Sequence, residues 1–334
     1  MFDSLLNDEI PDVPGLKPGY GRKNTARAWM RFQCHRHSQA ITAFSSAAVI
    51  LIAVASGLFI HYGQSGNKQL ADDIIPAEGQ VVLKLSSGES IALDTVEDGD
   101  TRLLKDGVLL DSESSELNYS FTGPSEELEF HELTLSKGKS HSVTLSDGTR
   151  VFLNSGSTLR YPVAFGEDSR TVELSGEAYF DVAREEKRPF VVHTSRFDVT
   201  VKGTAFDVCA YEEDPTATTT LVRGSVGVDE VTLEPGKQFR KDVVSGESNV
   251  VEVDTEEYTC WKDNVMILRH TAMDNIMKKL QKRYDFDYEL SEAASKENFS
   301  GNLPLNENLS VILDQLCAVS DLSFSIEKGH VRVE

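Results

Sequence analysis

One pair of neighbouring residues in this 334-residue chain could carry out chemistry on the chain itself, Gly203 and Thr204. In a strained Gly–Thr bond the threonine hydroxyl can attack the preceding carbonyl carbon, forming an ester that water then hydrolyses. Glycine allows the distorted backbone that this attack needs. The alternative is structural, with the glycine at a bulge or tight bend and Thr204 packed in the next strand. We expect the structural alternative, and therefore no enzymatic activity, and keep self-cleavage at this bond as a secondary hypothesis.

Other residue types that carry out chemistry are scattered along the chain. The eight histidines form no HExxH pattern, and no Cys/His spacing fits a zinc site. The sequence also has no GxSxG motif, no phosphate-binding glycine loop and no dinucleotide fingerprint. We therefore expect no metal, no cofactor and no catalytic residue beyond the candidate cleavage pair.

A long apolar stretch divides the chain into a small and a large part. It runs from Ile41 to Tyr62, and no charged side chain lies between Arg36 and Lys68. As a helix it would reach roughly 33 Å, enough to cross the hydrocarbon core of a bilayer. It is too long, and begins too far along the chain, for a cleaved signal peptide. We predict one transmembrane helix at residues 40–62.

The charges beside this stretch predict its orientation. Arg27, Arg31 and Arg36 precede it closely, whereas only Lys68 follows it closely. Because basic flanks stay in the cytoplasm, residues 1–39 would lie inside and the rest outside. The chain has a net charge of −21, and residues 1–39 carry six basic and four acidic side chains, which leaves −23 for the remainder. So acidic an outer part is not suited to binding nucleic acid, which requires neutralisation of phosphates.

The cytoplasmic segment contains two aromatic residues that could share one face of a short helix. Trp29 and Phe32 are three residues apart within a basic stretch, Thr25 to Arg36. One interpretation is an interfacial anchor that lies on anionic lipid; the other is a docking motif for a cytoplasmic partner. The residues alone favour the anchor.

Beyond a linker at residues 63–79, the pattern changes to short alternating strands separated by turns. Turns recur every 8 to 12 residues or so, which is typical of an all-β sandwich, roll or solenoid. Residues 81–94 and 141–154 share one layout, a strand, a glycine turn and a strand, which suggests a repeated hairpin. Residues 95–130 between them carry ten acidic and two basic side chains and are expected to form surface hairpins. We predict an all-β domain over residues 80–252.

The period changes again in residues 253–334, where two amphipathic helices alternate with short strands. We expect Thr271 and Asn306 to cap these helices. The predicted order is βαβ followed by βαββ, a small α/β domain. The apolar stripes of the helices comprise Met273, Ile276, Met277 and Leu280, and Leu309, Ile312, Leu313 and Leu316.

Three of the four cysteines, Cys209, Cys260 and Cys317, fall in the predicted outer part, and Cys34 falls in the inner part. An odd number without CxxC spacing does not define a disulfide framework. A bond between Cys260 and Cys317 is possible, but free, buried thiols are the better expectation.

Several linked motifs in this order resemble one known family, the FecR-type anti-sigma regulators of Bacteroidetes. The tail from about residue 264 resembles the small secretin/TonB-receptor N-terminal-like domain that ends these proteins. The motifs are LSDGTRVFLNSGSTLRYPVAF (145–165), RTVELSGEAYFDVA (170–183), RPFVVHT (188–194), VTVKGTAFDVCAY (199–211), TTLVRGSVGV (219–228) and LEPGKQ (233–238).

The resemblance implies a signalling relay across two membranes. An outer-membrane TonB-dependent transporter would contact the periplasmic part of a single-pass inner-membrane protein through the small α/β domain. That protein would control an extracytoplasmic-function sigma factor in the cytoplasm, and Trp29 and Phe32 match the end of the segment that grips the sigma factor. Some relatives cleave themselves at a Gly–Thr bond that matches Gly203 and Thr204. The alternatives are an anchored periplasmic binding or scaffold module without a sigma partner, and a self-cleaving regulator.

Overall fold

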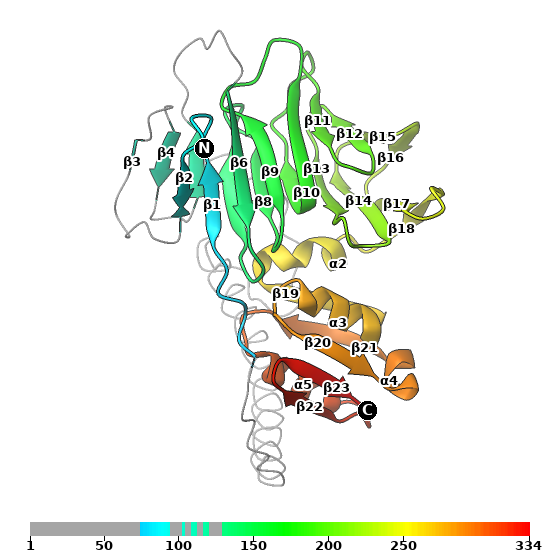
Figure 1. Ribbon diagram of the computed structural model, residues 1–334. Helices are drawn as coiled ribbons and strands as arrows, with labels where there is room; N and C mark the ends of the chain where they lie inside the picture. Colours follow the sequence, from blue (N-terminus) through cyan, green and yellow to red (C-terminus); the bar gives the residue numbers. More distant parts are fainter. Residues whose placement is uncertain (1–73, 94–101, 104–107, 112–115, 120–128) are drawn as a thin grey trace, which may run out of the picture. The chain divides into compact units, whose positions relative to one another are not determined.

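A computed structural model describes residues 74–93, 102–103, 108–111, 116–119 and 129–334 (Figure 1). The predicted transmembrane helix Ile41–Tyr62 and the predicted sigma-binding residues Trp29 and Phe32 lie outside the described residues. Within the described ranges, no helix has both the length and the apolar composition needed to cross a bilayer.

Strands β1 to β18 form two sheets that share one long strand, β10 (Arg170–Asp181). The first sheet has the order β2 (Ser90–Ala92), β1 (Val81–Lys84), β6 (Phe130–Leu135), β9 (Thr158–Pro162), β10, β11 (Phe190–His193), β12 (Asp198–Val201), β15 (Val226–Val228) and β16 (Val231–Leu233). The second has the order β3 (Arg102–Leu103), β4 (Val108–Asp111), β5 (Glu116–Tyr119), β7 (His141–Thr144), β8 (Arg150–Leu153), β10, β13 (Ala205–Ala210), β14 (Thr216–Arg223), β17 (Lys237–Asp242) and β18 (Ser248–Glu252).

Strand β10 passes from one sheet to the other at Gly176. Residues before it pair with β9 and β11, and residues from Gly176 onward pair with β8 and β13. Gly176 has a φ of +104°, which side-chain-bearing residues rarely adopt. The neighbouring Ser157 hydroxyl accepts a hydrogen bond from the Glu177 amide at 2.9 Å and donates one to the Glu177 carbonyl at 3.0 Å. A serine therefore satisfies the backbone where the strand changes sheets.

The two sheets pack their apolar faces against one another around one core. Alternate residues of β10 point inward, and these include Val172, Leu174, Ala178 and Phe180. The rings of Phe180 and Phe206 stack with centroids 5.2 Å apart within this core. The all-β expectation for this part of the chain is confirmed, and face-to-face packing makes it a sandwich.

The repeated hairpin is confirmed in its backbone geometry. In β1–β2, the Leu85 amide donates to Glu89 and the Gly88 amide donates to Leu85, at 2.8 and 2.9 Å. In β7–β8, the corresponding bonds join Leu145 with Thr149 and Gly148 with Leu145, at the same two distances. Both turn glycines have positive φ, +85° and +83°.

The C-terminal lobe has the predicted order of strands and helices around a separate core. Its elements are β19 (Val265–Ala272), α3 (Met273–Gln281), β20 (Asp287–Leu290), α4 (Glu292–Lys296), β21 (Asn298–Pro304), α5 (Leu309–Cys317), β22 (Phe324–Glu327) and β23 (His330–Val333). Strand β19 pairs with β21, and β23 lies between β20 and β22. The predicted apolar stripes of α3 and α5 are buried.

Three details of this lobe differ from the sequence-based expectation. The short helix α4 was not predicted, because its five residues include only three apolar or small ones and give no periodic stripe. The predicted caps are wrong: Ala272 and Asn308 hold the N-cap positions of α3 and α5, and neither makes a side-chain capping bond. Ser291 does cap α4, by accepting a hydrogen bond from the Ala294 amide at 3.1 Å.

A short helical segment that the sequence did not predict joins the sandwich to the lobe. It consists of α2 (Glu256–Thr259) and the 3₁₀ turn η2 (Cys260–Asp263), and it packs on β19. Its buried aromatic residue is Trp261. Four-residue helical turns are not stable in isolation, so this segment depends on what it packs against.

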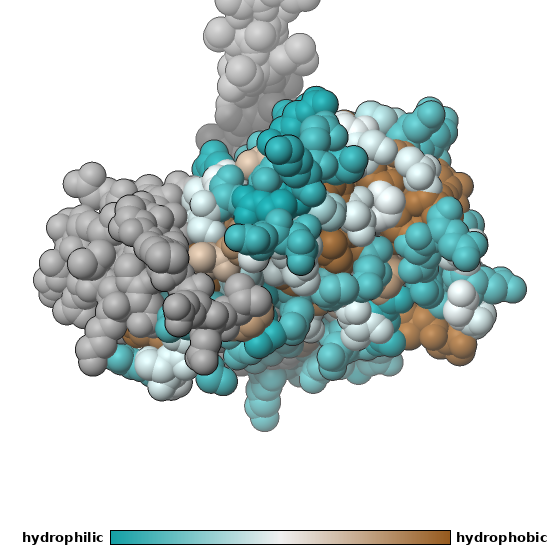
Figure 2. All heavy atoms as spheres, turned by 90° about the horizontal axis from the view of Figure 1, so that it is seen from above, coloured by the Kyte–Doolittle hydropathy of each residue, from teal (hydrophilic) through white to brown (hydrophobic). Residues whose placement is uncertain are grey.

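The described surface is mostly polar. Figure 2 shows one face, where hydrophilic side chains surround smaller groups of hydrophobic ones. Among the described residues, five large apolar side chains are exposed and they are scattered over several elements: Ile75, Val244, Val250, Val311 and Val319. Scattered exposed apolar residues are normal in soluble domains and mark no site by themselves.

Candidate functional site

The candidate cleavage pair lies directly before β13, next to a bulge between Ala205 and Phe206 in the pairing of β13 with β14. Thr204 is buried, and its hydroxyl donates a hydrogen bond to the Ser225 carbonyl at 2.9 Å. A Cβ placed on Gly203 would lie 2.7 Å from the Cα of Arg184, so only glycine fits there without a shift. Glycine beside a bulge and a packed threonine are the features of the structural alternative.

This geometry predicts that the chain stays intact. The Thr204 hydroxyl is engaged with a carbonyl, which is a poor base for activating a nucleophile. We expect intact-mass spectrometry of the purified protein to show one full-length species for the wild type and for Thr204→Ala alike.

Two fragments that meet between Gly203 and Thr204, present in the wild type and missing in Thr204→Ala, would contradict this prediction. Thr204→Ser is the matched variant in that case, because it keeps a hydroxyl at the same place. Fragments from Thr204→Ser would then identify the hydroxyl as the nucleophile.

The described residues contain no group of three or more His, Cys, Asp or Glu side chains that could hold a metal ion. Cys209, Cys260 and Cys317 are free thiols in this structure. Burial is the main cause that raises the pKa of each of them, for Cys317 to about 11. Thiols with raised pKa values are poor nucleophiles at neutral pH.

The most distinctive polar cluster lies where the sandwich meets the C-terminal lobe, and we call this boundary the seam. The two lobes have separate hydrophobic cores. The interactions of the seam described here are hydrogen bonds, ion pairs and cation–π contacts. The sandwich contributes Glu177, Asp207, Tyr211, Glu213 and Asp214; the other side contributes Trp261, Lys279 and Lys282.

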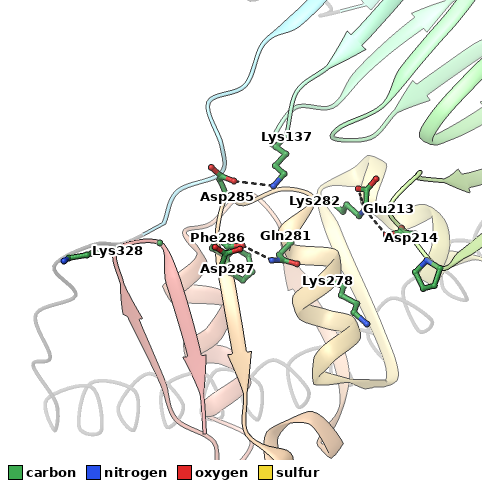
Figure 3. A pocket seen from close by; sticks show the side chains of 12 residues that line it. Lys137, Glu213, Asp214, Lys278, Gln281, Lys282, Asp285, Phe286, Asp287 and Lys328 are labelled. Carbon is green, nitrogen blue, oxygen red and sulfur yellow. Dashed lines mark hydrogen bonds and ion pairs between the residues drawn. The ribbon is translucent and has the colours of Figure 1, made fainter.

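Lys282 on the lobe side makes several contacts with one loop of the sandwich (Figure 3). Its ammonium group donates to Glu213 at 2.7 Å and to Asp214 at 3.0 Å. The same nitrogen lies 3.9 Å from the centroid of the Tyr211 ring. A third ion pair joins Lys137 to Asp285 at 3.3 Å. The three ion pairs border a cleft of about 550 Å³.

Two carboxyl groups lie at this boundary, one of them fully buried and the other partly buried. Asp207 is 1% exposed and accepts a hydrogen bond from the Trp261 indole at 3.3 Å. Glu177 is partly buried and accepts one from Asn154 at 2.6 Å. Burial raises the pKa of Glu177 to about 7. Burial, and then the nearby Glu177, raise the pKa of Asp207 well above its usual range. Each carboxyl therefore holds a proton more tightly here than it would in water.

The sequence did not identify the seam residues. Glu177 and Asp207 lie on the outward faces of their strands, where a charged residue is ordinarily exposed to water. Asp207 is covered by Trp261, which lies 54 positions further along the chain, and one sequence gives no sign of that contact. The sequence offered only the tryptophan itself as a clue, since tryptophan is usually well buried and its N–H then finds a partner.

Two family profiles match this chain, one after the other. Residues 131–227 match the family described as FecR protein, and residues 265–333 match the family described as FecR, C-terminal. The first match falls within the sandwich and the second spans the C-terminal lobe from β19 to β23. No curated protein matches the sequence.

Two solved structures that resemble this chain are crystal structures of a candidate anti-sigma factor from Parabacteroides distasonis ATCC 8503, at 1.65 and 2.50 Å resolution. Each is 30% identical in sequence to this chain and covers 61% of it, while this chain covers 98% of each solved chain. The TM-scores are 0.56 and 0.55. These comparisons establish the class: the chain belongs to the FecR-type anti-sigma factors. Membership in this family implies a sigma factor as a partner.

Proposed function

We propose that this protein is a single-pass inner-membrane anti-sigma factor that relays a signal between two proteins. On the periplasmic side, the C-terminal lobe binds the signalling domain of an outer-membrane TonB-dependent transporter. On the cytoplasmic side, residues 1–39 hold an extracytoplasmic-function sigma factor. The observation that carries this proposal is the order of an apolar stretch at Ile41–Tyr62, a FecR match and a FecR C-terminal match in one chain.

A relay of this kind requires two states with different affinities. Binding of the transporter outside can change retention of the sigma factor inside only if it favours one of those states. The acidic outer part, with its net charge of −23, favours a basic docking surface on the transporter domain.

The sigma side of the proposal predicts a strong effect of one aromatic residue. We expect the full-length protein, solubilised in detergent, to bind a purified sigma factor of this class from the same genome. Trp29→Ala should weaken binding about 30-fold or more, because buried aromatic anchors contribute about 2 kcal/mol or more to interfaces. Titration by fluorescence anisotropy of a labelled sigma factor measures this change.

Gln33→Ala is the matched control, since it removes a polar side chain next to Phe32 in the same segment. It should leave the dissociation constant within about twofold. If no sigma factor of the class binds the wild-type protein, the relay proposal fails on its cytoplasmic side. An anchored periplasmic binding or scaffold module would then be the better description.

A further inference from the structure

Strands β10 and β13 place two acidic side chains on the same outward face of the sandwich. The register pairs Tyr179 with Asp207 and Glu177 with Cys209. Paired residues of antiparallel neighbours point to the same side of a sheet, so all four side chains share one face. This face lies under η2, because Trp261 donates its indole N–H to Asp207.

We propose that closing the seam takes up a proton, held by the Glu177–Asp207 carboxyl pair, so that the C-terminal lobe is released more readily as the pH rises. This inference goes beyond the relay, since it needs neither the transporter nor the sigma factor. It assigns to the seam a sensitivity to the pH of the compartment that contains the sandwich.

The hydrogen bonds that the two carboxyls accept in the closed seam come from neutral donors, which do not neutralise two negative charges. The two described donors are neutral groups, the Asn154 amide and the Trp261 indole, at 2.6 and 3.3 Å. Two carboxylates that share an enclosed site repel one another, so one of them is neutralised by a proton.

The surrounding charged groups do not change the conclusion that one of the two carboxyls is protonated. Lys282, the cation with direct partners, is already bound to Glu213 and Asp214. Lys279 favours the charged form of both carboxyls and Lys282 that of Glu177, but burial is the largest effect on each pKa and raises it. The titratable and charged groups around the pair are Tyr179 of β10, Cys209 of β13, Tyr211, Glu213 and Asp214 of the following loop, Cys260 and Lys262 of η2, Lys279 of α3, and Lys282 directly after α3.

Opening the seam would withdraw Trp261 from Asp207 and expose this carboxyl, and the face of the sheet that it shares with Glu177, to water. Both groups would then return toward ordinary acidity. The seam contacts are polar and the hydrophobic cores are separate, so opening need not unfold either lobe. In Glu177 the carboxyl has a pKa of about 7 in the closed seam, against 4.5 when solvated. Because the closed state binds the proton more tightly, closure is favoured at low pH and loses that advantage as the pH rises from about 4.5 to 7.

The size of the effect follows from these two values. For Glu177 alone, the ratio of closed to open seam should fall about 30-fold between pH 5.5 and pH 8. Any additional proton bound by Asp207 would increase this change. The range from pH 5.5 to 8 also stays above the isoelectric point of 4.8.

Hydrogen–deuterium exchange of the full-length protein in detergent tests the proposal. The reporter is the indole N–H of Trp261, observed by NMR, because it is hydrogen-bonded to Asp207 across the seam and is released to water when the seam opens. After correction for the intrinsic pH dependence of exchange, its protection factor should be about 30-fold lower at pH 8 than at pH 5.5. Helix α5 in the core of the lobe provides the internal reference, and its protection should stay constant.

Glu177→Gln mimics the protonated side chain and should abolish most of the pH dependence, with protection at pH 8 close to the wild-type value at pH 5.5. Asp207→Asn is the second variant, since its amide oxygen can still accept from Trp261. Glu167→Gln, on an exposed loop, is the control and should behave as the wild type. Constant protection of the Trp261 indole in the wild type, or unchanged pH dependence in both seam variants, would overturn the proposal. Neither result would bear on binding of the sigma factor.

Discussion

Replacing Arg170 with methionine is expected to lower the free energy of unfolding by about 3 to 5 kcal/mol, because it leaves a buried carboxylate without its cation. Arg170 occupies an inward position of β10 and is 0% exposed. Its guanidinium donates to Asp147 at 2.8 Å and to the carbonyls of Ala183 and Arg188 at 2.7 and 3.0 Å. Methionine fills a similar volume but supplies none of these three bonds.

The ion pair between Arg170 and Asp147 also connects parts of the chain that are distant in sequence. Asp147 lies in the β7–β8 turn, where it also accepts from the amide and hydroxyl of Thr149 at 2.9 and 2.7 Å. Arg170 thereby joins this turn to the loop that follows β10. We expect the loss to appear in urea denaturation followed by circular dichroism as a lower midpoint with an unchanged slope.

Arg223→Met is the matched control for this prediction. Arg223 makes an ion pair of the same length with Asp181, 2.8 Å, but its side chain is 70% exposed. Exposed pairs contribute between zero and about 1 kcal/mol, so this variant should lose less than 1 kcal/mol. Equal losses in the two variants would show that burial of Arg170 does not determine its contribution.

Local sequence patterns predicted the fold well for elements whose structure depends on their own residues rather than on distant contacts. The repeated hairpin was visible because Leu85 and Leu145 precede turns with glycine at the same place, and both turns have the same hydrogen bonds. The order of strands and helices in the C-terminal lobe followed from the change in hydrophobic period. The short helices α2 and α4 were missed, because they carry too few turns to show a period.

The candidate site was predicted less well, because it depends on contacts between distant residues. Periodicity identifies Arg170 as an inward residue only after the register is known, and its partner Asp147 lies 23 positions away. The same holds for Asp207 and Trp261, which are 54 positions apart. The pair Gly203–Thr204 lies beside the bulge of β13. That its bond stays intact is a prediction, as is sigma binding by Trp29 and Phe32.

Gly176→Ala is the second variant with a large expected effect, a loss of about 3 kcal/mol or more. A Cβ at this position would lie 2.4 Å from the Ser157 hydroxyl and 2.7 Å from its Cα. The φ of +104° adds backbone strain of about 1 to 3 kcal/mol, and overpacking adds a similar amount. Thermal and urea denaturation of the purified protein measure this loss.

Gly148→Ala separates these two causes. Gly148 also has a positive φ, +83°, but a Cβ there meets nothing within 4 Å. Gly148→Ala should therefore lower the free energy of unfolding only by the cost of backbone strain, about 1 to 2 kcal/mol. The double variant Gly176→Ala/Ser157→Ala should lose less stability than the two single variants lose in total, because both changes affect one contact. If Gly176→Ala cost no more than Gly148→Ala, β10 could pass between the sheets with a side chain at its bend. The close approach of Ser157 would then not be what requires glycine there.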